Sequence, residues 1–195
     1  MNGATDPLSG SPTAVRQYGI QRFLADVRED IARIARGCNE LTLVCAELVD
    51  RRKLGEQLGA AALASAESAL TRAMLLNMKE CDRLGRLAEG RHALLLPGVG
   101  SSGARLHGEN LQKAFADDMN RREDKSLKIA CALGIVCVGR DEAGSAQSLL
   151  ERGNRALRKA LEQQSVYICQ ERLALSERPT LVHSNEKRFL FFGEG

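Results

Sequence analysis

Short runs of apolar and β-branched residues alternate along this chain with long stretches of helical periodicity. The clearest strand candidate is residues 41–48, and a second apolar run covers residues 127–138 with Gly134 inside it. Apolar residues recur every three or four positions over residues 13–36, which predicts a helix that ends at Gly37. Strands that alternate with helices limit the chain to an α/β or α+β sandwich, with a central mixed β-sheet flanked by helices.

The same patterns predict a hairpin, three more helices and a last short strand. The hairpin covers residues 85–96, because two short strand-like segments flank a tight turn at Glu89-Gly90. A loop over residues 97–103, rich in Gly and Ser, follows it. The helices and the strand are predicted at residues 54–79 with a break near Gly59, 104–122, 146–163 and 165–169.

The length and net charge limit how many domains the chain can form and which partners it can bind. The 195 residues fit one domain over residues 13–169, with an entry loop at 1–12 and a C-terminal extension at 170–195. A net charge of only +3 gives no electrostatic case for nucleic acid. The longest apolar runs are far shorter than a bilayer span, and no signal peptide opens the chain. We therefore expect a cytoplasmic protein without membrane insertion.

The cysteines and histidines do not form a metal-binding or catalytic pattern. No pair of cysteines has C-x-x-C spacing, and the three histidines are scattered without H-x-x-x-H spacing. We expect reduced structural thiols, no metal and no cofactor. The residues concerned are Cys38, Cys45, Cys81, Cys131, Cys137, Cys169, His92, His107 and His183.

Four landmarks fall in an order and at a spacing known from one domain family. They are residues 6–12 (DPLSGSP), residues 86–97 (an Arg-Leu pair, five residues and then ALLLP), residues 131–135 (CALGI) and residues 152–160 (RGNRALRKA). Together they resemble a GGDEF, or diguanylate cyclase, domain, whose motifs there are D-x-L-T-G-L-P-N-R, R-x-GGDEF before a strand and Pro, S-x-G, and R-A-D-x-A-L-Y-x-A. The resemblance covers about residues 6–169 and implies the palm architecture of nucleotidyl cyclases.

The resemblance also implies that the signature motif is lost. Cyclases of this family join two GTP molecules into cyclic di-GMP, and carboxylates hold the metal ions that such phosphoryl transfer needs. The five signature positions fall on Ala88, Glu89, Gly90, Arg91 and His92. Ala88 and Glu89 put side chains where Gly lets the backbone approach phosphate, and Arg91 replaces the catalytic and metal-binding carboxylate. A degenerate, catalytically inactive domain is expected.

Other implied substrate positions have changed as well. Glu47 stands where the family has its first metal-ligand Asp, so this vestigial position keeps a carboxylate. Gly55 replaces the guanine-reading Asn, and Leu161 replaces the phosphate-contacting Lys of the last helix. The family's F-K pair becomes Arg51-Arg52, and Glu56 keeps an acid. These changes remove hydrogen bonds to the base and a cation from the phosphate site. The alternative for Glu47 and Glu56 is that they are ordinary solvated charges at a strand or helix edge.

A weakened remnant of the family's product-binding inhibitory site, R-x-x-D with a further Arg, is implied upstream. Its positions hold Lys79, Asp82 and Arg86. Lys79 keeps the charge of the lost Arg without its planar fork, while Asp82 and Arg86 are retained. Cyclic di-GMP is thus a candidate ligand, and an ordinary solvated cluster at a helix end is the alternative.

The sequence therefore predicts a non-catalytic regulatory or interaction module of bacterial cyclic di-GMP signalling, with a protein partner or self-association. One alternative is an active cyclase with an aberrant motif, which would need Mg²⁺, and another is a pure dimerisation scaffold. Residues 189–192 (FLFF) hold three of the five Phe residues, and they are expected either to dock on the domain or to anchor a partner.

Overall fold

A six-stranded sheet forms the centre of the described chain, with the strand order β1-β3-β4-β2-β5-β6. The computed structural model describes residues 18–37, 40–121, 129–139, 142, 144–163 and 168–171. The predicted entry loop (1–12) and the Phe-rich residues 189–192 lie outside these ranges. The strands are β1 (Tyr18–Gly19), β2 (Leu41–Leu48), β3 (Arg83–Ala88), β4 (Arg91–Pro97), β5 (Cys131–Val138) and β6 (Ile168–Glu171). The helices are α1 (Ile20–Ala35), α2 (Arg51–Leu76), α3 (Ser101–Asn120) and α4 (Ala146–Glu162).

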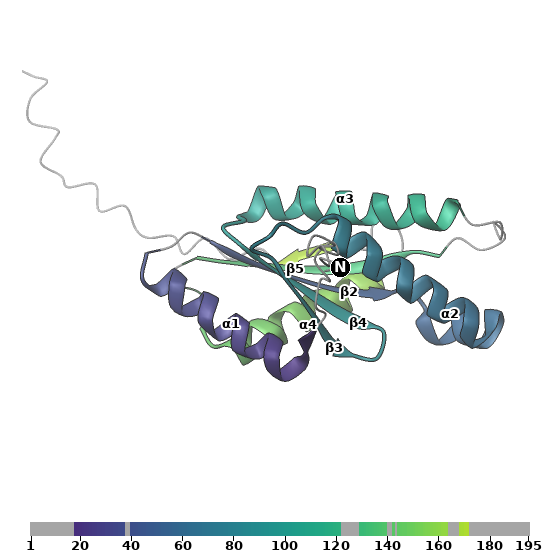
Figure 1. The fold of residues 1–195 in the computed structure, drawn as a ribbon, viewed down its shortest axis with the longest axis horizontal. Coiled ribbons are helices and arrows are strands. Elements are labelled where there is room, and N and C mark those ends of the chain that lie inside the picture. The colour runs from purple at the N-terminus through teal and green to yellow at the C-terminus, as the bar shows by residue number, and fades with distance from the viewer. Residues whose placement is uncertain are drawn as a thin grey trace, which may run out of the picture.

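Helices cover both faces of this sheet, as Figure 1 shows: α2 and α3 lie on one face, and α1 and α4 lie on the other. The alternation along β2 follows these layers. Val44 and Ala46 join the core under α2 and α3, whereas Leu43 and Cys45 join the core under α1 and α4. Because β2 is buried on both faces, it reads as a continuous apolar run.

The predicted fold class is confirmed. The sheet is mixed, because β1 pairs with β3 and β5 with β6 in parallel, while the central pairs are antiparallel. The strand predicted over residues 41–48 is β2, and the predicted hairpin is β3–β4. The predicted break in the second helix is a kink at Gly59, whose φ of 83° and ψ of 167° are not helical.

Several predicted boundaries were wrong, for local reasons. Residues 101–103 were predicted as loop but begin α3, since Gly100 stands extended at its N-cap and Gly98, with φ 77°, makes the turn. The second helix begins at Arg51 and ends at Leu76, because the Asn77 side chain donates to the Ala73 carbonyl at 2.8 Å. Strand β5 begins at Cys131, and β6 extends to Glu171. The two-residue strand β1 was not predicted.

No helix in the described ranges combines the length and the hydropathy that crossing a bilayer requires.

Helix α4 crosses strand β5 closely at Gly134. A Cβ on Gly134 would lie 2.6 Å from the Cα of Leu157 and 2.7 Å from the Gly153 carbonyl oxygen. Both obstacles are backbone atoms, which cannot rotate away. The glycine predicted inside this strand therefore sets how closely α4 packs on the sheet.

Replacing this glycine is expected to destabilise the fold. In Gly134→Ala the methyl group forces α4 away from β5, and we expect the free energy of unfolding to fall by about 1–3 kcal/mol or more. Gly139→Ala is the matched control, because the nearest atom to a Cβ there is 4.0 Å away. Urea unfolding followed by circular dichroism measures both, and equal stability of the two variants would contradict the packing argument.

Candidate functional site

The turn of the β3–β4 hairpin is formed by Glu89 and Gly90, so the five residues 88–92 surround it. Strand β4 pairs with β2 in a register that sets Arg91 opposite Glu47. Gly90 adopts a positive φ of 69°, which suits a tight turn. The local sequence thus builds the hairpin, and the antiparallel register brings Arg91 to the end of the central strand.

An ion pair joins these two opposed residues. Both Nε and Nη2 of Arg91 donate to Oε2 of Glu47, at 2.8 and 2.6 Å. The Nη1 of Arg91 reaches Oδ1 of Asn154 on α4 at 3.4 Å. The side chains of Glu47 and Arg91 are 17% and 31% exposed, so the pair is partly withdrawn from solvent. The carboxylate of Glu47 is thereby neutralised by the protein's own cation.

A second arginine fastens the turn to the start of α2. Arg51 donates from Nε to Glu67 at 2.6 Å and from Nη2 to Glu89 at 2.8 Å. Its side chain lies directly under the turn, since a Cβ on Gly90 would be 2.6 Å from Cδ of Arg51. Arg51 therefore holds the hairpin tip through Glu89, and Glu67 on the same helix fixes the position of the Arg51 guanidinium.

The positions predicted for base and phosphate contacts carry no matching groups. Gly55 is half-buried, and a Cβ there would lie 3.2 Å from the Leu63 side chain. Glu56 is exposed and 3.8 Å from Arg52, in an i,i+4 ion pair. Leu161 packs partly buried against the core under α1 and α4. The interpretation of Glu56 as an ordinary surface charge fits this geometry.

The structure brings only part of the predicted upstream set together. Asp82 is 6% exposed, and its Oδ2 accepts the backbone N–H of Lys79 at 2.7 Å, which closes the turn after α2. Arg86 lies four residues further along β3, and its side chain is exposed. The Asp82 carboxylate thus has a structural role, whereas Lys79 and Arg86 are both exposed to solvent.

Solved structures of diguanylate cyclases and GGDEF domains superpose on this chain. The active GGEEF domain of a diguanylate cyclase from Vibrio cholerae superposes with a TM-score of 0.71 at 16% identity, covering 82% of this chain and 100% of that one. The GGDEF domain of DgcB from Caulobacter crescentus, in complex with c-di-GMP, gives 0.70 at 13% identity, covering 87% and 98%. Diguanylate cyclase SiaD from Pseudomonas aeruginosa, in complex with its activator SiaC, gives 0.67 at 20% identity, covering 85% and 61%.

This chain has a GGDEF-like fold. No protein-family model matches the sequence, and no curated protein matches it. The likeness is therefore carried by the backbone, at sequence identities too low to transfer an activity.

The hairpin residues do not fit the metal ions of a GGDEF-type cyclase. Mg²⁺ is held by carboxylates and other oxygen ligands, yet here Oε2 of Glu47 is taken up by two nitrogens of Arg91. The third residue of the cluster, Asn154, is neutral and stands at the Asp of the R-A-D motif. Among the described residues no group of three or more His, Cys, Asp or Glu side chains could hold a metal.

Three residues near the predicted site positions were not found from the sequence: Asn154, Glu67 and His107. Asn154 could have been found from its place in the last motif, and its contact with Arg91 completes the cluster. Glu67 carried no signal, because its contact with Arg51 depends on the kink in α2. His107 was dismissed as scattered, yet its Nε2 is buried without a hydrogen-bond partner among the described residues. Burial lowers the pKa of His107, while the charge of Asp82 opposes this and that of Lys79 adds to it.

His92, at the last signature position, is a buried polar residue. It is 5% exposed, and its Nδ1 has no hydrogen-bond partner in the described chain. Burial lowers the pKa of His92 below its ordinary value of 6.5, and the charge of Arg86 lowers it further, while Glu67 opposes this. The folded state therefore favours the neutral imidazole.

Removing the cation from the Glu47–Arg91 pair is expected to cost stability. In Arg91→Ala the partly buried carboxylate loses its partner, and we expect the free energy of unfolding to fall by about 1–3 kcal/mol. The further change Glu47→Gln should restore part of the loss, which a double-mutant cycle measures. Arg105→Ala is the control, since its pair with Glu109 is about half exposed and should contribute at most ~1 kcal/mol. Equal losses in the two single variants would contradict a special role for the hairpin pair.

The buried imidazole predicts a loss of stability in mild acid. Because the pKa of His92 is lower in the folded state than in the unfolded chain, the unfolded state binds a proton more readily. Stability should be constant above about pH 6.5 and should decrease as the pH falls below it. In His92→Phe this decrease should be smaller, as measured by thermal unfolding between pH 7.5 and 5. His107→Gln provides the comparison, since burial also lowers the pKa of His107. An unchanged pH profile in His92→Phe would overturn the assignment.

Proposed function

We propose that this chain is a catalytically inactive regulatory or interaction module of bacterial cyclic di-GMP signalling, acting in the cytoplasm. The observation that carries the proposal is the ion pair between Arg91 and Glu47. It puts a guanidinium on the carboxylate that a cyclase of this fold would need for a metal ion. Transfer of a phosphoryl group between two nucleotides requires positive charge supplied by metal ions that also orient the phosphates. A fixed arginine bound to Glu47 repels those ions.

The second arginine cluster supports the same conclusion. In an active domain the glycines of the motif leave room for substrate phosphate beside the hairpin. Here Arg51, Glu67 and Glu89 join the turn to α2 through side chains. Two carboxylates at this place repel a triphosphate, and their hydrogen bonds to Arg51 would have to break before phosphate could bind there.

A cyclic di-GMP receptor at Lys79, Asp82 and Arg86 is the second candidate. It is supported by the exposure of two cations, Arg86 on β3 and Lys79 shortly before it, and by the DgcB domain of the same fold, whose structure contains c-di-GMP. Against it, the Asp82 carboxylate is buried and accepts the Lys79 backbone N–H. Binding would therefore rely on the two cations, and we rank this function below protein interaction.

An active cyclase and a pure dimerisation scaffold remain the alternatives to this proposal. An active enzyme would require Glu47 to exchange Arg91 for a metal ion. A role in protein contact has a parallel in SiaD, which has the same fold and whose structure includes its activator SiaC.

The decisive experiment measures GTP turnover and nucleotide binding in the same samples. With GTP and Mg²⁺ we expect no formation of cyclic di-GMP, as followed by liquid chromatography. Titration calorimetry with cyclic di-GMP should show weak binding or none. If binding occurs, Arg86→Ala and Lys79→Ala should each reduce it, whereas Arg155→Ala on α4 should leave it unchanged. Turnover that disappears in Glu47→Ala would overturn the proposal of an inactive domain.

A further inference from the structure

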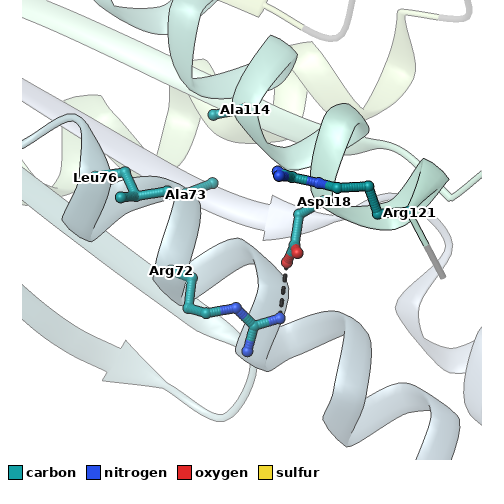
Figure 2. A pocket seen from close by; sticks show the side chains of 6 residues that line it. All are labelled: Arg72, Ala73, Leu76, Ala114, Asp118 and Arg121. Carbon is teal, nitrogen blue, oxygen red and sulfur yellow. Dashed lines mark hydrogen bonds and ion pairs between the residues drawn. The ribbon is translucent and has the colours of Figure 1, made fainter.

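An open groove of about 430 Å³ lies between α2 and α3, on the face of the sheet away from the Glu47–Arg91 pair. The two helices run antiparallel here, since Arg72 contacts Asp118 while Leu76, one turn later on α2, lines the groove beside Ala114, one turn earlier on α3. Figure 2 shows the lining residues, which are Arg72, Ala73, Leu76, Ala114, Asp118 and Arg121.

The groove has an apolar centre with a prominent leucine. Leu76 is the last residue of α2. It is 77% exposed, more than any other large hydrophobic residue in the described ranges. Ala73 and Ala114 leave space beside it because they are small. An exposed aliphatic residue next to such a space is the usual setting for an apolar anchor of a binding partner.

The rim of the groove carries positive charge. Arg72 is neutralised by Asp118, whose Oδ2 lies 2.7 Å from Nη2 of the arginine. Arg121, directly after the last residue of α3, donates from Nε to the Asp117 carbonyl at 3.1 Å, and its side chain extends over the groove in Figure 2. The charged lining residues, Arg72, Asp118 and Arg121, thus carry one net positive charge.

We propose that the groove between α2 and α3 is the docking site for an amphipathic, acidic helix of a protein partner. Its apolar side chains would cover Leu76 and fill the space over Ala73 and Ala114, and a carboxylate would bind the terminal nitrogens of Arg121. A groove between antiparallel helices suits a helical ligand, which presents anchors at three- and four-residue spacing. The proposal rests on the proposed interaction role and names the surface and the partner chemistry for it.

The charge of the rim selects this occupant over a second copy of the chain. A two-fold contact would set the same face against itself, and each face carries one net positive charge from its lining residues, Arg72, Asp118 and Arg121. A small anion is disfavoured because the centre of the groove is aliphatic and because Arg72 is already paired.

A pair of synthetic peptides tests the proposal with the full chain. The first is a helix of about 18 residues, long enough to hold helical structure, with Leu on one face and Glu beside it. The second has Lys in place of every Glu. We expect fluorescence anisotropy to show the acidic peptide binding at least about tenfold more tightly than the basic one. Leu76→Ser should weaken this binding about tenfold, and Arg121→Glu should reverse the preference between the peptides.

Matched variants on the opposite face serve as controls. Arg155→Glu makes the same charge change on α4, and Ile20→Ser removes an exposed aliphatic residue of α1. Neither should alter peptide binding. Binding of both peptides with equal affinity, or binding unaffected by Arg121→Glu, would overturn the proposal. So would a dimer in sedimentation that Leu76→Ser dissociates, because the second copy would then be the occupant.

The outcomes separate this proposal from the proposed function. If the acidic peptide fails to bind while GTP is not turned over, the docking site is wrong and the inactive assignment stands. If GTP is turned over, the inactive assignment fails whether or not the peptide binds.

Discussion

The central strand β2, buried on both faces and paired on both edges, is the constraint on which the rest of this structure depends. Its antiparallel registers with β4 and β5 place every other strand and give each face of the sheet one pair of helices. The register with β4 also determines the chemistry of the hairpin, because it sets Glu47 opposite Arg91. A shift by one residue would turn Arg91 to the other face of the sheet and leave the Glu47 carboxylate unpaired.

The Glu47–Arg91 pair balances a partly buried charge at the end of the central strand within the fold itself. A carboxylate that is partly buried at a strand end needs a positive partner. Arg91, which stands opposite Glu47 in the sheet, is that partner. The charge of Glu47 is therefore balanced by a side chain of the same chain and not by a bound ion. Arg51 does the same for Glu67 and Glu89 at the turn. Both arginines hold the hairpin through side-chain contacts, which under the proposed function would compete with a nucleotide and its metal ions.

The parts of the fold that could be predicted from sequence are those with a local cause. The hairpin followed from its turn residues, the kink from Gly59 and the central strand from its continuous apolar run. The start of α3 was missed because Ser and Gly read as loop, although a helix tolerates them in its first turn. The pair of Glu47 and Arg91 was predicted only as two separate substitutions. Their contact is set by strand register across 44 residues, which no local pattern contains.

The two faces of the sheet also separate the Glu47–Arg91 pair from the groove between α2 and α3. Glu47, Arg91 and the α4 residue Asn154 belong to the face covered by α1 and α4, whereas Leu76 and Arg121 lie over the opposite face. Arg91 contacts α4 through Asn154, and no residue of the hairpin lines the groove between α2 and α3. The groove is lined by residues of α2 and α3 and by Arg121 at the end of α3, so under the proposed function it can bind a partner without the hairpin taking part in catalysis. A protein-interaction role is therefore compatible with a degenerate signature on physical grounds, because the two functions draw on different layers of the same sandwich.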